Sequence, residues 1–86
     1  MKSKSSTDKV IQVNDISIGD NLKAQRLKAG YRQIDFVAAL QLNGIDISVF
    51  TYNRIEKGSQ NPSVSFLLAA CHLLNCDMND LFGFKK

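Results

Sequence analysis

The chain contains few residues of the types that build metal, disulfide or catalytic sites. Of its 86 residues two are Cys and one is His. Cys71, His72 and Cys76 lie close together, but a closed zinc site needs four ligands and the sequence has neither a second His nor a Cys-x-x-Cys spacing. We therefore expect two reduced core cysteines, an exposed His72, and no metal or cofactor. No nucleophile with a base, phosphate loop or pair of acids is present, which argues against an enzyme.

Long apolar segments are also missing. No run approaches the roughly 18 residues of a membrane helix, and the amino-terminal MKSKSSTDKV lacks the apolar stretch of a signal peptide. We expect a cytoplasmic protein without membrane contacts.

At 86 residues the chain makes one small domain, whose core is marginal by size and is commonly supported by dimerisation or tight helix packing.

Charge is only mildly unbalanced. Eleven Lys or Arg against eight Asp or Glu give a net charge of +3, a bias that is compatible with a polyanionic partner but decides little alone. Residues 1–15 are polar and basic and are expected to form a flexible arm, with a VIQV patch at 10–13. Such an arm either follows phosphates or is a solvated tail.

What the chain does contain is a set of capped, amphipathic segments. Ser48 is a natural N-cap and Gly58 suits the left-handed position that ends a helix, so SVFTYNRIEKG predicts a short helix. One face carries the residues Val49, Tyr52, Ile55 and Glu56. The outer face carries two cations, Arg54 and Lys57, and no acid, which indicates a helix that lies against a partner.

Four further helices are expected around it. The first runs from Gly19 to Ala29, with Ile18, Leu22 and Ala29 inward, and the second spans 32–40, with Phe36, Val37 and Leu40 inward. The longest follows Ser63, and its core side is expected to be Val64, Leu67, Cys71 and Leu74. Asn75 can take the left-handed position at its end, and Asp77 caps a last helix over Met78 to Phe82.

The order of these segments resembles a known family. From Ile18 to Phe82, the elements IGDNLKAQR, GYRQIDFVAAL, ISVFTYNRIEKG and NPSVSFLLAACHLLNCDMNDLF are similar to the helix-turn-helix domains of the Cro and lambda-repressor type. The resemblance implies an all-α, compact five-helix bundle over residues 16–84, followed by a tail at 85–86. In this fold the second and third helices form the motif and the third enters the major groove of double-stranded DNA.

The resemblance also implies roles for individual residues. It places an ion pair between Arg26 and Glu56 that would orient the third helix. Base contacts would come from Val49, Phe50, Thr51 and Arg54. Phosphate contacts would come from Arg32, Gln33, Ser48, Asn53, Lys57, Ser59 and Asn61.

Plainer alternatives stay open at several of these positions. Arg54 either reads guanine or binds a phosphate, and Val49 either touches thymine methyls or packs inward. Arg32 is either beside a phosphate or an ordinary exposed residue, with Asp35 defining the helix start. Thr51, Asn53 and the loop after the third helix are equally consistent with solvated side chains.

The connection between the two motif helices departs from the family pattern. Gln41 to Ile47 is longer than the usual tight turn and bends at Gly44. Ile45 and Ile47 are expected to fold back onto the core. Asp46 would add a negative charge on the DNA side, which is mildly unfavourable for binding.

The expected function is a sequence-specific regulator, a repressor acting as a homodimer on a palindromic site. Apolar surface in excess of what a small monomer hides would supply the dimer contact, through Phe66, Leu73, Phe82 and Phe84. The alternative is a protein-interaction module on the same fold, such as an antitoxin or regulatory partner, that uses the third or fourth helix to bind another protein.

Overall fold

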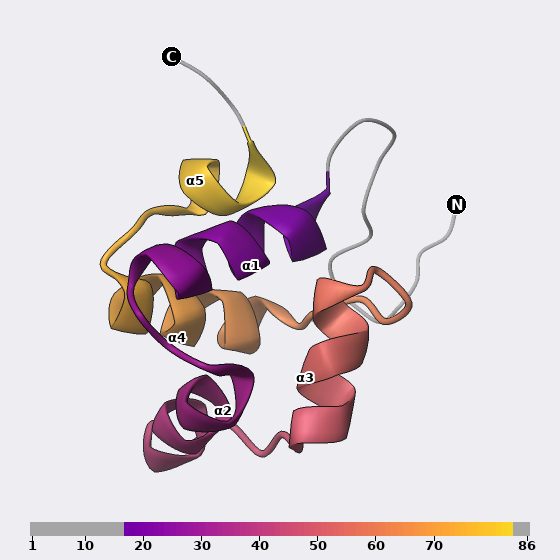
Figure 1. Cartoon of the computed structure of the whole chain (residues 1–86), viewed down its shortest axis with the longest axis vertical. Coiled ribbons are helices and arrows are strands. Elements are labelled where there is room, and N and C mark those ends of the chain that lie inside the picture. The colour runs from indigo at the N-terminus through magenta and orange to yellow at the C-terminus, as the bar shows by residue number, and fades with distance from the viewer. Residues whose placement is uncertain (1–16, 84–86) are drawn as a thin grey trace.

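Five helices form the part of the chain that the computed structural model describes, residues 17–83. They are α1 (Ile18–Lys28), α2 (Gln33–Leu42), α3 (Val49–Glu56), α4 (Val64–Leu74) and α5 (Met78–Phe82). α1 contacts α5 on one side and α3 on another, while α2 contacts both α3 and α4 (Figure 1). The expected all-α five-helix bundle is therefore confirmed. The predicted arm at 1–15, its VIQV patch and the tail at 85–86 lie outside the described residues.

Side-chain caps explain where most helices begin. Ser17, Ser48, Ser63 and Asp77 each accept a hydrogen bond from the backbone N–H three residues later. Asp77 and Asp80 form a reciprocal capping box. Asn75 ends α4 in the left-handed region, at φ 53°. The caps predicted at Ser48, Ser63, Asn75 and Asp77 are thus confirmed.

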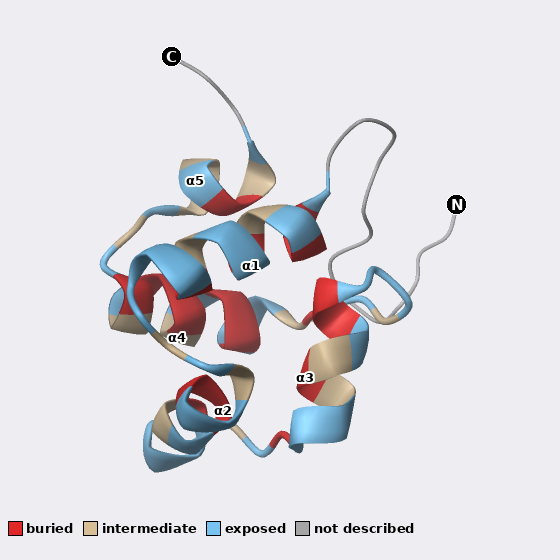
Figure 2. Cartoon of the chain, viewed as in Figure 1, coloured by how far each residue is buried: buried red, intermediate tan, exposed pale blue. Residues whose placement is uncertain are grey.

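The core is a single apolar cluster enclosed by all five helices (Figure 2). A row of rings runs into it from the half-buried Tyr31, in which Tyr31, Phe36, Tyr52 and Phe66 follow one another at centroid separations of 5.1, 5.6 and 6.0 Å. Such tilted and edge-on ring pairs add to the stabilisation that burial itself provides. The other buried apolar side chains include Ile18, Leu22, Val37, Leu40, Ile55, Leu67 and Leu81.

Three predicted orientations are wrong. Ala29 is exposed because α1 ends at Lys28 and Ala29 is its C-cap. The buried face of α4 is centred between Leu67 and Ala70, which leaves Val64 a quarter turn away and 38% exposed. The same rotation turns Phe66 inward, where it is only 2% exposed.

The turn between the motif helices is shorter than the sequence suggested because α2 continues to Leu42. Gly44 bends the chain at φ 85°, and Ile47 is buried while Ile45 packs against the core, as predicted. The Gln41 side-chain amide donates to the Ile47 carbonyl at 2.8 Å. This bond fixes the turn to the last part of α2.

The start of α1 lies directly against the end of α3. A Cβ built on Gly19 would sit 2.3 Å from the carbonyl oxygen of Glu56 and 2.6 Å from that of Ile55. Because these are backbone atoms, they cannot move aside as a flexible side chain would. Gly19 is therefore the residue that lets the two helices approach, a role that the sequence analysis did not identify.

Candidate nucleic-acid interface

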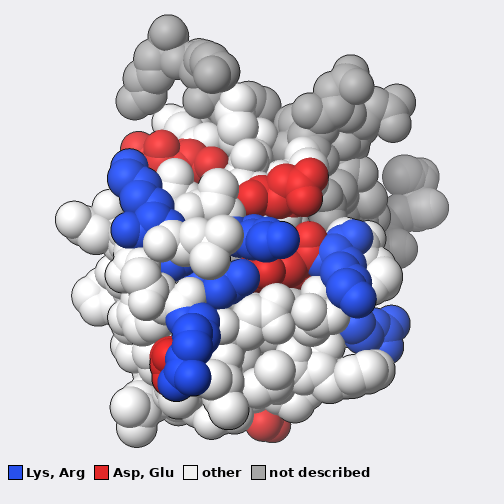
Figure 3. All heavy atoms as spheres, viewed as in Figure 1, with Lys and Arg blue, Asp and Glu red and all other residues white. Residues whose placement is uncertain are grey.

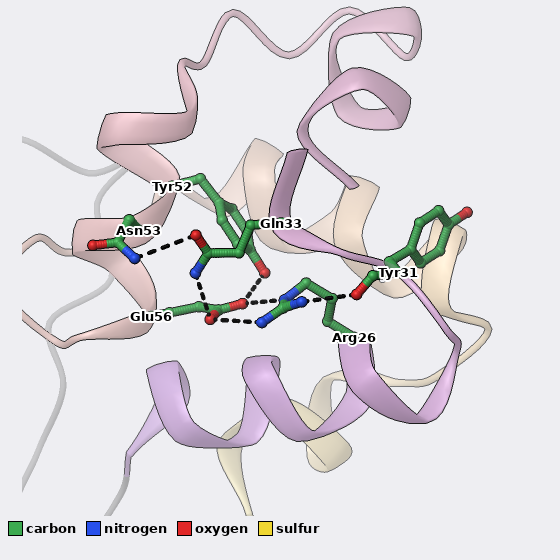
Figure 4. Close-up of polar contacts among 6 residues, drawn as sticks. All are labelled: Arg26, Tyr31, Gln33, Tyr52, Asn53 and Glu56. Atoms are coloured by element: carbon green, nitrogen blue, oxygen red, sulfur yellow. Dashed lines mark hydrogen bonds and ion pairs between the residues drawn. The ribbon is translucent and has the colours of Figure 1, made fainter. Parts of the chain in front are cut away.

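A buried ion pair anchors the inner face of α3. The Arg26 Nε lies 2.6 Å from Glu56 Oε2, and Arg26 Nη2 donates to Oε1 at 3.2 Å (Figure 4). Both side chains are nearly inaccessible, at 6% and 4% exposure. Arg26 also donates through Nη1 to the Tyr31 carbonyl at 2.7 Å. The pair that the resemblance implied is thus present, and it joins α1 to the end of α3.

The same carboxylate accepts two further hydrogen bonds. Tyr52 donates its hydroxyl to Oε2, and Gln33 donates its amide N–H to Oε1 at 3.0 Å. The Gln33 carbonyl oxygen in turn accepts from the Asn53 side-chain amide at 3.3 Å. We call Arg26, Gln33, Tyr52, Asn53 and Glu56 the Glu56 network, and it connects α1, the first turn of α2 and α3 (Figure 4).

The network holds defined protonation states. Burial raises the pKa of Glu56, but hydrogen bonds from Arg26, Tyr52 and Gln33 outweigh it and leave the pKa below its usual value. Burial and the bond to Glu56 raise the pKa of Tyr52 well above its ordinary value. At neutral pH the network therefore contains one anion, one cation and a protonated phenol, with no buried side-chain polar atom unpaired within residues 17–83.

The opposite face of α3 is apolar at its start and cationic further along. Phe50 is 71% exposed and Val49 is 38% exposed. Arg54 lies one turn after Phe50, with its Cζ 5.6 Å from the centre of the ring. Lys57 is exposed at the C-cap. Val49 therefore does not pack inward with Tyr52 and Ile55, contrary to one of the two interpretations.

Most of the other side chains predicted to meet DNA also make bonds within the domain that hold α3 and its flanks in place. The Ser48 hydroxyl accepts from the Thr51 N–H and lies 3.2 Å from Thr51 Oγ1, to which it donates. The Ser59 hydroxyl donates to the Arg54 carbonyl at 3.2 Å. Asn53 and Gln33 bond each other within the Glu56 network. Asn61 is an exposed residue of the loop after α3.

Arg32 precedes α2 and is paired with an acid. Its Nε lies 2.7 Å from Asp35 Oδ2 and its Nη2 donates to Oδ1 at 3.1 Å, with side-chain exposures of 79% and 47%. The hydrogen bond between them raises the pKa of Arg32 and lowers that of Asp35. Arg32 is the N-cap of α2 and makes no side-chain cap bond. Arg32 is therefore exposed, which both interpretations allow, and its charge is paired with that of Asp35 in the first turn of α2.

The described residues carry no net formal charge. Six Lys or Arg and six Asp or Glu lie within residues 17–83, and the remaining five cations and two acids belong to 1–16 and 84–86. The face in Figure 3 accordingly shows both signs close together. Within residues 17–83, Arg54 and Lys57 take part in neither of the two ion pairs, so both remain available to a polyanion.

Among residues 17–83, the sulfur-containing side chains gather where α4 ends and α5 begins. Cys71 is buried and its thiol lies 3.6 Å from the Met78 sulfur, while Cys76 is partly buried. Burial raises the pKa of both thiols, that of Cys76 to about 12. His72 is exposed, as predicted. No His, Cys, Asp and Glu group suited to a metal ion is found in the part of the chain described.

The predicted dimer contact needs correction at one position. Phe66 is a core residue and cannot present a surface. Leu73 and Phe82 are partly buried and pack against the core, and Phe84 lies outside the described residues. The large apolar side chains that α4 does expose are Val64 and Leu68, at 38% and 56%.

No helix among residues 17–83 is long and apolar enough to span a membrane.

Comparison with known proteins agrees with this geometry. A family profile described as helix-turn-helix, of the Cro/C1 type, matches residues 22–81, from the middle of α1 to the end of α5. No curated protein sequence matches the chain. Because the profile covers most of the five-helix bundle, this chain belongs to the Cro/C1-type helix-turn-helix family of DNA-binding proteins.

Proposed function

We propose that the protein is a sequence-specific transcription regulator, a repressor that binds double-stranded DNA with α3 in the major groove. The observation that carries the proposal is the division of α3 into two faces. Its inner face is fixed by Tyr52, Ile55 and Glu56, while Phe50, Arg54 and Lys57 are left outward. Such a regulator works in the cytoplasm and represses by occupying its site.

The exposed cations take different tasks in this arrangement. Arg54 projects from the middle of α3, where a guanidinium can pair with the N7 and O6 of guanine. Lys57 at the end of α3 and Asn61 in the next loop meet phosphates. Arg32 and Gln33 lie at the start of α2, where exposed backbone N–H groups also favour a phosphate. A phosphate near Arg32 would compete with Asp35 for the guanidinium.

The proposed regulator is a homodimer on a palindrome. Two α3 helices would then enter successive major grooves about 34 Å apart. The exposed pair Val64 and Leu68 on α4 is the apolar surface that supports a contact between copies, in place of Phe66. Sedimentation at micromolar concentrations, with Leu68→Ser as the variant, tests this part separately from DNA binding.

Selection from random duplex DNA at two salt concentrations tests the proposal. Counterion release makes phosphate contacts salt-dependent, so a real DNA-binding protein loses affinity as salt rises. We expect a palindromic sequence with half-sites about one helical turn apart. Enrichment of no sequence, with binding insensitive to salt, would exclude a DNA-binding function.

Two substitutions then separate base reading from phosphate binding. Arg54→Ala is expected to weaken binding to the selected site by about 1 to 3 kcal/mol and to relax specificity at one base pair. Gln33→Ala is expected to weaken binding to all sequences similarly. Because Gln33 also bonds Glu56, its variant must first show an unchanged helical circular dichroism spectrum. The reverse pattern of specificity loss would contradict these roles.

A second function is favoured by one specific observation. Leu42 at the end of α2 is 88% exposed and Phe50 at the start of α3 is 71% exposed, which suits contact with another protein. In that case the family fold serves as an interaction module, for example an antitoxin. Leu42→Ser would then abolish partner binding, whereas under the DNA-binding proposal it leaves the affinity for the selected site nearly unchanged.

A further inference from the structure

The side chains that α3 exposes for reading bases are of only two kinds. Asn53 and Thr51 are half-buried, and each already has a partner, since the Asn53 amide donates to Gln33 and the Thr51 hydroxyl oxygen accepts from Ser48. What remains outward before the C-cap is the apolar pair Val49 and Phe50 and the cation Arg54. Asn and Gln are the side chains that pair with adenine through two hydrogen bonds. On this helix Asn53 is the residue of that type, and it is half-buried with its amide turned to Gln33, which is unfavourable for a bidentate adenine contact.

Apolar and cationic side chains each match one feature of the major groove. Thymine is the base that presents a methyl group there, and an apolar side chain reads it by contact. Guanine presents N7 and O6, two acceptors that suit the planar guanidinium of Arg54. The free face of α3 is therefore complementary to a thymine methyl and a guanine.

The distance between Phe50 and Arg54 limits how far apart these bases lie. The two residues are one helical turn apart, about 6 Å along the axis. Arg side chains on a helix lean toward its amino-terminus, and Arg54 accordingly has its Cζ 5.6 Å from the Phe50 ring centre. Because base pairs rise about 3.4 Å each, the ring and the guanidinium reach base pairs one or two steps apart.

We propose that each half-site contains a thymine one or two base-pair steps from a guanine. Phe50 and Val49 contact the C5-methyl group of the thymine, and Arg54 bonds the N7 and O6 of the guanine. This proposal rests on the proposed function and specifies its DNA. The Phe50 ring has two roles in it. It covers the methyl group, and it supports the Arg54 guanidinium through a cation–π contact that restricts the flexible side chain before DNA arrives.

Base analogues test the proposal without changing the protein. Deoxyuridine in place of the thymine removes only the methyl group and is expected to lower the affinity about fourfold, the value of one buried methylene. 7-Deazaguanine removes one of the two acceptors for Arg54 and is expected to cost about fivefold. 7-Deazaadenine at adenines of the same half-site is the matched control and should have no effect, since no amide reads their N7.

Protein variants assign the effects to residues. In Phe50→Ala the loss caused by deoxyuridine should fall below twofold, whereas in the control Leu42→Ala it should remain fourfold. In Arg54→Ala the loss caused by 7-deazaguanine should disappear. Fluorescence anisotropy at one fixed salt concentration measures all of these.

The outcomes separate this inference from the function on which it rests. A selected palindrome that tolerates deoxyuridine at every thymine, or that is weakened by 7-deazaadenine, overturns the inference while DNA binding stands. An effect of deoxyuridine that is equally large in Phe50→Ala overturns it as well. Failure to select any sequence overturns the proposed function itself.

Discussion

Two ion pairs in this domain have nearly the same geometry but opposite surroundings, and they should therefore differ sharply in their effect on stability. Arg26–Glu56 has an N–O distance of 2.6 Å and side-chain exposures of 6% and 4%. Arg32–Asp35 has a distance of 2.7 Å and exposures of 79% and 47%. Glu56→Gln and Asp35→Asn make the same chemical change in the two settings, so each is the control for the other.

The magnitude for Glu56→Gln follows from what the change leaves behind. Arg26 keeps its charge in a buried position without an anion, which in other proteins costs about 3 to 5 kcal/mol. The new amide still accepts some of the bonds from Tyr52 and Gln33, so we expect the lower end, about 3 kcal/mol. For a domain whose m-value is about 1 kcal/mol per M of urea, the unfolding midpoint should fall by about 3 M. Asp35→Asn should leave the midpoint within the error of measurement, because exposed pairs contribute little.

Acidification gives an independent check with a defined sign. The folded pKa of Glu56 is lowered, so its stabilisation is fully present above the unfolded pKa, about 4.3, and is lost as the pH falls through the folded pKa. The difference in unfolding free energy between the wild type and Glu56→Gln should therefore be constant at neutral pH and shrink below about pH 4.

A rescue variant covers the case in which Glu56→Gln does not fold. Arg26→Met with Glu56→Gln removes both charges and should recover most of the lost stability, since a buried pair replaced by apolar groups is often neutral. Equal midpoint shifts for Glu56→Gln and Asp35→Asn would refute the reasoning. So would a Glu56→Gln loss that persists undiminished at pH 3.

Three further outcomes follow from contacts in the fold. Gly19→Ala should destabilise the domain by about 1 to 3 kcal/mol in thermal unfolding, because its Cβ would meet the Glu56 carbonyl. The control is Ala24→Gly at an exposed position of the same helix, which should cost about 1 kcal/mol because Ala favours a helix more than Gly does. A Gly19→Ala variant that is more stable than the wild type would contradict the close approach. Phe66→Ala should cost about 3 to 5 kcal/mol in urea unfolding and leave self-association unchanged in the remaining folded protein; the reverse result would restore Phe66 as a dimer contact. Burial raises the pKa of Cys76 to about 12, so the rate of its alkylation in a stopped assay should rise about tenfold per pH unit from pH 8 to 10. A plateau below pH 9.5, as for an ordinary thiol with a pKa of about 8.5, would show that burial does not raise the pKa of Cys76.

Local signals in the sequence were sufficient for most of the fold. Caps act within one turn, so Ser48, Ser63 and Asp77 predict helix starts without knowledge of the rest of the chain. The inward faces of α2 and of the middle of α3 followed from periodicity alone. The rotation of α4 did not, because a helix that is apolar on nearly every side has no pattern to show whether Val64 or Phe66 faces the core.

The site was predictable where it depends on residue type and not where it depends on contacts between distant segments. The resemblance supplied Arg26 and Glu56, but the bonds from Gln33 and Asn53 join residues 20 or more positions apart. No local pattern encodes them. The same is true of Gly19, whose importance comes from the carbonyl groups of α3. The predicted helix began at Gly19 itself. A cap assigned to Ser17 would have placed Gly19 inside the first turn, where a glycine is unusual, and this is the one signal that could have drawn attention to it.

Under the proposed function, the short length of α3 makes DNA recognition depend on residues of its buried face. An isolated helix of eight residues is not stable in water, so α3 owes both its existence and its direction to tertiary contacts. Tyr52 and Ile55 supply the packing, and the Glu56 network fixes the end of the helix against α1. If the network loosens, Phe50 and Arg54 keep their chemistry but lose their shared orientation. Glu56→Gln should then reduce affinity for the selected site more than affinity for random DNA, although Glu56 itself contributes no contact to either.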